Sequence, residues 1–191
     1  MKLNALLLLA SLATLATSCG QDAASKKLAD ETEARVVASI KQVLVQAPAQ
    51  GAALDPVHAW YQSEVPNIIK LDPNAEAVYR DHAAILQEVA ANQTKLATDP
   101  ILTPAQGQGV RTMYQKLVDE STANVQQLTL MATGKTTMSE AEQRQFVAGV
   151  ADKEKKELEL VRYFTKRTAF GIDQETRKKN QKKFDREVWG R

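Results

Sequence analysis

Apolar residues recur at helical spacing along most of this chain. Between residues 28 and 47 they fall three or four positions apart, which gathers them on one face of a helix. Similar stripes run through residues 74–96, 104–128 and 140–164. No stretch alternates between apolar and polar positions as a half-buried strand does. The pattern therefore predicts an all-α fold, an elongated bundle of about three long helices plus short helices.

Two helix starts are marked by capping boxes, at Thr103-Pro104-Ala105-Gln106 and at Ser139-Glu140-Ala141-Glu142. In such a box the hydroxyl of the first residue and the side chain three positions later each bond the other's free backbone N–H. Proline suits the first helical position, where no N–H is needed. We therefore expect long helices to begin after Thr103 and after Ser139.

Prolines and glycines divide the rest of the chain. Three prolines lie between residues 52 and 73, and this segment is expected to be irregular. Gly171 is expected to interrupt the last helix. These breaks predict a helical domain over residues 28–173 and a basic helical tail over residues 174–191.

The N-terminal segment is typical of a secretion signal. Lys2 is followed by an apolar run from Leu6 to Ala16 and by small residues, and the run is shorter than the roughly 20 residues that span a bilayer. Cys19 is the one cysteine of the chain. The segment from Leu15 to Gly20 resembles the lipobox of bacterial lipoproteins, in which the signal is cut before a cysteine that carries diacylglycerol.

This resemblance implies a signal peptide over residues 1–18, lipidation of Cys19 and a tether over residues 19–27. It places the mature chain in the cell envelope, facing the periplasm and anchored in a membrane by lipid. Because Gly20 stands where an aspartate often retains lipoproteins at the inner membrane, the outer membrane is the expected address. An ordinary signal peptide with an incidental cysteine is the alternative.

Charge is distributed unevenly along the chain. Residues 19–151 hold 11 Lys and Arg against 15 Asp and Glu, whereas residues 152–191 hold 13 against 8. The basic run at the C-terminal end predicts docking on an acidic protein face or on lipid head groups, and a solvated tail is the alternative. Nucleic acid is not expected to be bound directly by an exported protein. The run consists of Arg177, Lys178, Lys179, Lys182 and Lys183.

No catalytic constellation emerges from the sequence. The two histidines, His58 and His82, lie in different segments without metal-ligand spacing, and His82 is expected on the flank of its helix. Ser121 has no evident base nearby in sequence. The chain is therefore expected not to be an enzyme and to hold no metal or cofactor. Trp60 and the adjacent Tyr61 could lie at a membrane interface, bind in a partner groove or cover one end of the bundle.

A series of short motifs runs in order from Leu102 to Gly190. In this order and spacing the C-terminal half resembles the TrbJ-like family of conjugal transfer proteins, in particular the small TraI-type proteins encoded by conjugative transposons. The motifs are Leu102-Thr103-Pro104, Met113-Tyr114-Gln115-Lys116-Leu117, Glu120-Ser121, Gln127-Leu128, Val161-Arg162-Tyr163-Phe164-Thr165, Arg177-Lys178-Lys179-Asn180 and Trp189-Gly190.

The resemblance implies a non-enzymatic, periplasm-facing component of a conjugative type IV secretion apparatus, either a minor pilus protein or an assembly factor. Its expected partners are the membrane, reached through the lipid anchor, and other secretion or pilus proteins. Long amphipathic helices suit such a role because an exposed helix face can dock in a partner groove. A stand-alone helical envelope lipoprotein that acts as a binding module is the alternative.

Overall fold

The protein is helical throughout the part of the chain that the computed structural model describes. Its backbone is described for residues 4–44, 50–134 and 137–190, and its side chains for residues 23–44, 53–134 and 137–190. Within these ranges there are helices and no strands, so the all-α prediction is confirmed. The helices are α1 (Asn4–Val43), α2 (Gln50–Tyr61), α3 (Asn67–Lys70), α4 (Pro73–Ala97), α5 (Pro104–Thr133) and α6 (Glu140–Trp189).

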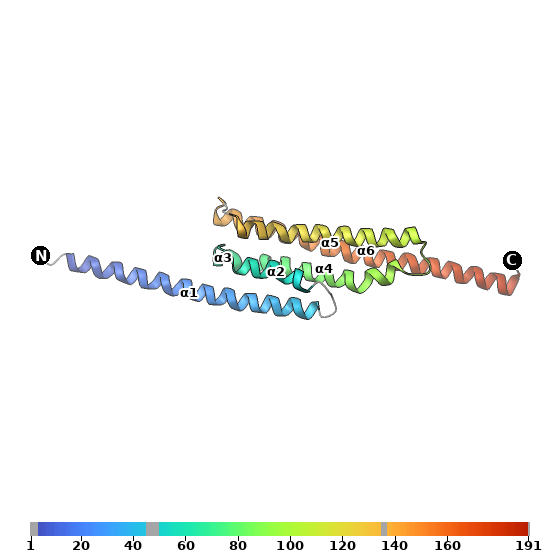
Figure 1. Cartoon of the computed structure of the whole chain (residues 1–191), viewed down its shortest axis with the longest axis horizontal. Coiled ribbons are helices and arrows are strands. Elements are labelled where there is room, and N and C mark those ends of the chain that lie inside the picture. The colour runs from blue at the N-terminus through green and yellow to red at the C-terminus, as the bar shows by residue number, and fades with distance from the viewer. Residues whose placement is uncertain (1–3, 45–49, 135–136, 191) are drawn as a thin grey trace.

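Helices α4, α5 and α6 form the centre of the bundle and contact one another most extensively. Each of the three runs antiparallel to the one before it in the chain (Figure 1). Helix α1 packs against α2 and α4, and α2 packs against α5. Four helices have 25 residues or more, so the expectation of about three long helices is confirmed only in part.

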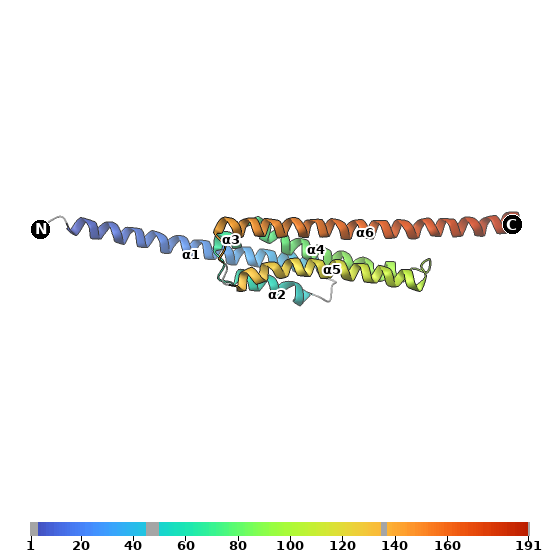
Figure 2. The same ribbon diagram turned by 90° about the horizontal axis from the view of Figure 1, so that it is seen from above.

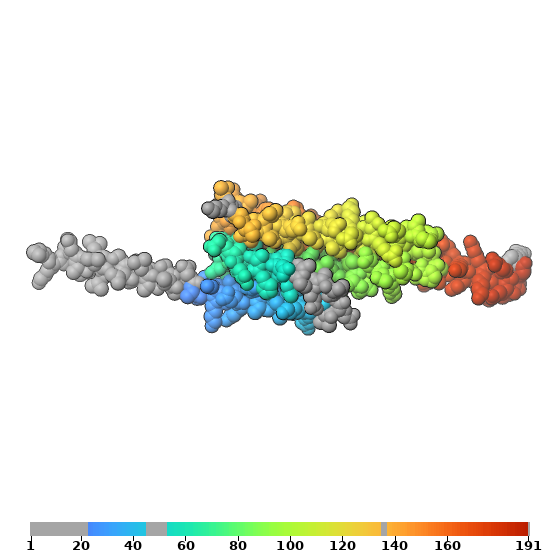
Figure 3. Space-filling view, viewed as in Figure 1, coloured from blue at the N-terminus to red at the C-terminus, as the bar shows by residue number. Residues whose placement is uncertain are grey.

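The helices α1 and α6 extend beyond the bundle at opposite ends (Figure 1), and the turned view shows α6 along one edge of it (Figure 2). Helix α6 has 50 residues, which corresponds to a length of about 75 Å. The space-filling view shows its last turns as a narrow rod beyond the body (Figure 3). The last turns of α6 are thus a bare helical end that no other described element covers.

Both predicted capping boxes are present. Thr103 Oγ1 accepts from Gln106 N, and Gln106 Oε1 accepts from Thr103 N at 2.8 Å. Ser139 and Glu142 make the same pair of bonds, with Ser139 N donating to Glu142 Oε2 at 2.7 Å. The bonds from Ser139 lower the pKa of the Glu142 carboxyl because they stabilise its charged form. Helices α5 and α6 therefore begin at the expected residues.

The segment expected to be irregular is folded instead. Helix α2 continues through Pro56, and α3 follows after a short turn. Proline inside a helix removes one backbone hydrogen bond and costs about 3 kcal/mol. This cost is offset because Val57, Trp60 and Tyr61 are buried in the core.

Two other helix limits differ from the expectation. Helix α6 passes through Gly171 without interruption, since one glycine costs a helix only about 1 kcal/mol. Helix α1 includes the residues expected to form a tether, among which Ala23, Ala24 and Lys27 favour helix. Cys19, the predicted lipidation residue, precedes the residues whose side chains are described, so its modification stays a prediction.

The core consists of two apolar clusters that follow one another along the bundle axis. The first joins α1, α2 and α3 to the beginning of α4 and the end of α5 around Trp60 and Tyr79. The second lies where α4 ends and α5 begins, around Ile85 and Leu117. A buried polar layer lies where they meet. Ser121 and Glu154 fall between the two clusters on α5 and α6, and His82 lies at the same level of α4, next to Ala83 of the first cluster.

Two glycines at the start of α5 should respond oppositely to alanine. A Cβ at Gly107 would collide with the backbone carbonyl oxygen of Ala97, whereas a Cβ at Gly109 would meet nothing within 4 Å. We expect Gly107→Ala to lower the free energy of unfolding by about 1–3 kcal/mol and Gly109→Ala to raise it by roughly 0.5–1 kcal/mol. Urea unfolding of both variants measures this. Equal effects would contradict the close approach of α4 and α5.

Candidate functional site

The predicted docking residues all lie on the projecting end of α6. Arg177, Lys178, Lys179, Lys182 and Lys183 are exposed, as is every residue from 177 to 190 except the half-buried Asp185. The helix leaves the bundle shortly before, since Ile172 is the last apolar side chain that packs against the second cluster. The basic run is therefore presented on a helix that is surrounded by solvent.

The root of this projection is held firmly. Tyr114 of α5 packs edge-on against Phe164, with ring centroids 5.0 Å apart. Its hydroxyl also lies 2.8 Å from Thr165 Oγ1 within the buried interface. These contacts fix the direction of α6 where it leaves the bundle, so the exposed end extends the same straight helix.

Ion pairs within the projecting end are local and exposed. Arg177 pairs with Asp173 at 3.0 Å, and Lys178 pairs with Glu175 at 2.7 Å. Exposed pairs of this kind contribute at most about 1 kcal/mol and are screened by salt. Lys179 and Lys182 form no ion pair within the described part of the chain. The surface therefore keeps a positive charge that is available to a partner.

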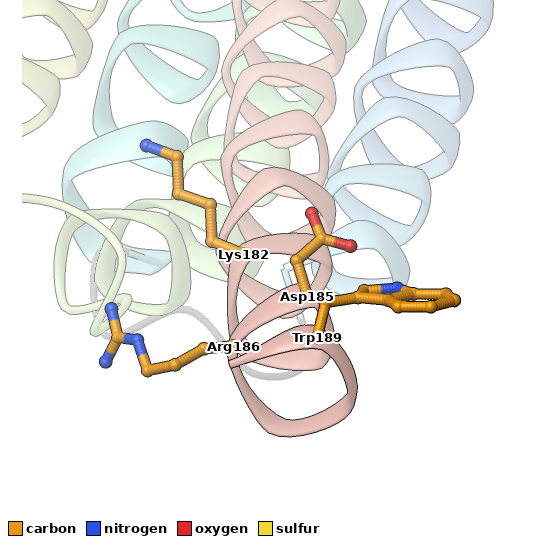
Figure 4. A pocket seen from close by; sticks show the side chains of 4 residues that line it. All are labelled: Lys182, Asp185, Arg186 and Trp189. Carbon is orange, nitrogen blue, oxygen red and sulfur yellow. The ribbon is translucent and has the colours of Figure 1, made fainter. Parts of the chain in front are cut away.

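Surface depressions on this end are shallow features of a single helix. One is lined by Lys182, Asp185, Arg186 and Trp189, and all four residues belong to α6. In the close view Lys182 and Arg186 extend to one side of the helix, while Trp189 extends to the other (Figure 4). A depression with one wall cannot enclose a small ligand as a cleft does. The exposed end suits contact with a macromolecular surface instead.

The most distinctive chemical arrangement lies inside the bundle. His82 Nδ1 lies 2.6 Å from Ser121 Oγ, and the Ser121 hydroxyl donates to Glu154 Oε1. Asn124 Nδ2 donates to Glu154 Oε2 at 2.9 Å. Since the Ser121 proton goes to the carboxylate, His82 is the donor toward Ser121 in this network. The Glu154 carboxylate therefore accepts a hydrogen bond on each oxygen.

This polar layer has the residue types of a hydrolase triad but not its arrangement. In such a triad histidine removes the serine proton and a carboxylate orients the histidine, whereas here the serine donates to the carboxylate. Ser121 and Glu154 are fully buried, and His82 is nearly so, so a substrate cannot reach the hydroxyl. The layer acts as a satisfied polar contact that joins α4, α5 and α6 at one level.

Sequence reasoning missed this layer. It expected His82 on the flank of its helix, which is wrong because His82 is buried, and it did not connect Ser121 with either of its partners. The three residues lie on separate helices, 39 and 33 positions apart for the two bonded pairs. A signal was present, because each residue falls on the apolar stripe of its own helix. A polar residue on a buried stripe requires a partner from another helix.

Glu157, next to the polar layer on α6, should make stability depend on pH. Burial, followed by the charges of Glu120 and Glu154, raises its carboxyl pKa to about 7. The unfolded chain has a pKa near 4.5, so the folded state binds more protons between these values and the residue's contribution to stability falls as pH rises from about 4.5 to 7.

Glu157→Gln should therefore raise the melting temperature at pH 8 and leave it nearly unchanged at pH 4.5. Thermal unfolding across this range measures the effect. The matched control is Glu159→Gln, which removes an exposed carboxylate from the same helix. If both variants gave the same pH profile, burial of Glu157 would not be the cause.

The remaining candidate residues are separate from one another. His58 Nδ1 lies 2.6 Å from Glu33 Oε1 and ties α2 to α1, far in sequence from the polar layer. Trp60 and Tyr61 are buried in the first cluster, so they cover one end of the bundle and are not displayed to a membrane or partner. Among the described residues no cluster of three or more His, Cys, Asp and Glu is suited to hold a metal ion.

The chain matches no family model, no curated protein and no solved structure. Within the described residues, no helix is both long and apolar enough to cross a bilayer. The function is therefore inferred from the geometry of α6 and of the polar layer.

Proposed function

We propose that this protein is a non-enzymatic component of a cell-envelope assembly and that it docks through the projecting end of α6. The observation that carries the proposal is a helix that leaves a packed bundle and continues with its basic and aromatic side chains exposed. An isolated helix in water gains little stability from its own backbone. A partner that packs along this end would supply the missing contacts.

The buried polar layer supports a non-catalytic role. Its hydroxyl and carboxylate have no access to solvent, and each of its hydrogen bonds is used to join helices. A serine whose proton is already donated to a buried carboxylate is not activated as a nucleophile. The layer therefore serves the fold, and α6 remains the surface through which the molecule acts.

The finer proposal places this assembly in a conjugative type IV secretion apparatus, as a minor pilus or assembly protein that faces the periplasm. Its support is the ordered resemblance from Leu102 to Gly190, together with the lipobox-like segment that ends at Cys19. A lipid on Cys19 would hold the protein at the membrane, and the outer membrane is the proposed address. The bundle would then present α6 to other secretion or pilus proteins.

Deleting the gene tests this role. We expect the frequency of DNA transfer from donor cells to fall while growth stays unchanged. Replacing Lys179, Lys182 and Lys183 with glutamine should weaken transfer in part, because charge on a docking surface mainly speeds and orients association. The matched control changes Lys153, Lys155 and Lys156, which are exposed on the bundle portion of the same helix. Wild-type transfer in the deletion strain would rule out the conjugative role.

A second candidate is a stand-alone envelope lipoprotein that acts as a binding module. The observation that favours it is the concentration of exposed positive charge on a helix end, which needs only an acidic partner and no secretion machinery. It is distinguished by genomic context, since a transfer operon also encodes a secretion ATPase and a channel core. A lipid on Cys19 together with wild-type transfer in the deletion strain would favour this candidate.

A further inference from the structure

Four exposed apolar side chains gather at the end of the bundle where α3 lies. Figure 1 shows α3 and the turn from α5 to α6 at this end, and α1 leaves the bundle there on its way to the N-terminus. The four side chains are at least 40% exposed, although they are large and hydrophobic: Leu28, Ile68, Leu130 and Met138. We call this set the α3-end cluster.

Contacts between the helices hold this end together. Asn67 Nδ2 donates to Ser25 Oγ at 3.2 Å, which sets the beginning of α3 beside α1. A single surface depression is lined by the segment before α3, the last residues of α5 and Gln143 of α6. Leu130 lies in the last turn of α5, and Met138 directly precedes the N-cap of α6. The cluster therefore comes from segments that meet at one end of the molecule.

The N-terminal part of α1 places a membrane at this end. Cys19 lies six residues before Ser25 on the same helix, and α1 runs along the axis of the bundle (Figures 1 and 2). Six helical residues correspond to about 9 Å, whereas a helix with its side chains is about 10–12 Å wide. If Cys19 carries the proposed lipid, a partner helix does not fit between the membrane and the α3 end. The lipid surface itself then meets the cluster.

Charge does not attract the α3 end to an anionic membrane. The exposed acids near this end are Asp30, Glu31, Glu64, Glu140 and Glu142, against the bases Lys26, Lys27 and Arg144. Attraction must therefore come from the apolar side chains, which leave water when they enter the bilayer surface. A lipid on Cys19 would make this contact intramolecular, so that a small apolar surface is sufficient. The contact should not depend on salt or on anionic lipid.

We propose that the α3-end cluster contacts the bilayer in which the protein is anchored and holds the bundle upright on that membrane. This inference rests on the proposed envelope role, through the lipid on Cys19, and specifies which surface of the bundle meets the membrane. Helix α6 begins at this end, and Arg177 lies 37 residues beyond Glu140, a distance of about 55 Å along the helix. The basic run thus points away from the anchoring membrane and does not bind its head groups.

The orientation is tested with the full-length lipoprotein in phosphatidylcholine vesicles that carry a quencher on their head groups. Lipidation occupies the thiol of Cys19, the one cysteine of the chain, so a fluorophore labels only a cysteine that is introduced. Fluorophores on Ile68→Cys and Met138→Cys should lose most of their emission. Those on Lys153→Cys and Trp189→Cys, farther along α6, should lose little. Equal quenching at the four positions, or the strongest quenching at position 189, would overturn the proposal.

A double variant tests whether the cluster holds this orientation. Ile68→Ser with Leu130→Ser removes two exposed apolar side chains from the α3 end, and circular dichroism checks that the helices are kept. The label at position 138 should then lose most of its quenching, while flotation shows that the lipid still holds the protein on the vesicle. The matched control, Phe170→Ser with Phe184→Ser, removes two exposed aromatic side chains from α6 and should leave the quenching unchanged. Unchanged quenching in the cluster variant would mean that the tether alone sets the distance, against the proposal.

The role of charge and the role of the anchor are tested separately. Quenching at positions 68 and 138 that required phosphatidylglycerol, or that vanished in high salt, would show that charge holds the end and would overturn the proposal. If Cys19 carried no lipid, the unmodified chain would be labelled there and would not float with vesicles, and both the anchor and the proposal would fail. Wild-type transfer in the deletion strain removes only the conjugative role, because the quenching pattern on vesicles upholds the α3-end contact independently of transfer.

Discussion

Replacing Trp60 with alanine should lower the free energy of unfolding by about 3–5 kcal/mol, the usual loss when a large buried aromatic side chain is truncated. Trp60 is fully buried and lies in the first apolar cluster, where α2 meets α1 and the central helices. Its removal leaves a cavity that rigid neighbouring helices fill only in part. The melting temperature should fall by roughly 10 °C.

The chain supplies its own control for this prediction. Trp189, the second tryptophan, is 69% exposed on the projecting end of α6. Trp189→Ala should change the free energy of unfolding by less than about 0.5 kcal/mol. Chemical unfolding of both variants, followed by circular dichroism, gives the comparison. Similar losses at the two positions would show that Trp60 does not anchor α2.

The Trp60 side chain also carries a buried polar atom. Its indole Nε1 makes no hydrogen bond within the described part of the chain. Trp60→Phe keeps most of the apolar volume and removes this unpaired donor. The phenylalanine variant should therefore recover more than half of the stability that alanine loses.

Local signals in the sequence were sufficient to locate where α5 and α6 begin. The boxes at Thr103 and Ser139 depend only on residues three positions apart. Such bonds form within one helical turn and do not depend on the rest of the fold, and both helices begin where expected. The segment around Pro56 differs because its conformation is decided by burial of the adjacent Val57 and Trp60. Tertiary packing overrode the local preference of proline, and no local pattern shows this.

Some features of the candidate site also follow from local sequence, whereas others depend on the whole fold. Exposure of the basic run on α6 was predictable, because a charged stretch with few apolar residues has little to bury. The polar layer was not, since its bonds depend on the register of three helices that only the whole fold determines. Gly171 is a third case. Its low helix propensity is offset by the helix-forming residues on either side, so α6 continues through it.

Removing two members of the polar layer should be strongly destabilising. The double variant His82→Leu with Ser121→Ala leaves the fully buried Glu154 carboxylate with Asn124 as its one remaining partner in the layer. We expect a loss of about 3–5 kcal/mol, because an incompletely compensated charge stays in the interior. Urea unfolding measures the loss. The surface control Glu159→Leu should change stability by less than about 0.5 kcal/mol.

Adding Glu154→Leu to the double variant should reverse most of this loss. The charge is then gone, and leucine fills a similar volume between the two apolar clusters. Buried ionic groups replaced by apolar residues of similar size are often neutral or stabilising in effect. If the triple variant were no more stable than the double, the loss would come from the missing hydrogen bonds of the layer and not from the uncompensated charge of Glu154.

The triple variant also tests why a polar layer lies in this core. With the layer intact, α4, α5 and α6 have one alignment in which His82, Ser121 and Glu154 meet. A continuous apolar core permits neighbouring alignments, because leucine packs against many apolar neighbours. We expect the triple variant to keep its helix content but to show broadened or doubled amide signals in two-dimensional NMR spectra. Sharp, single signals with native dispersion would show that apolar packing alone sets the register of the bundle.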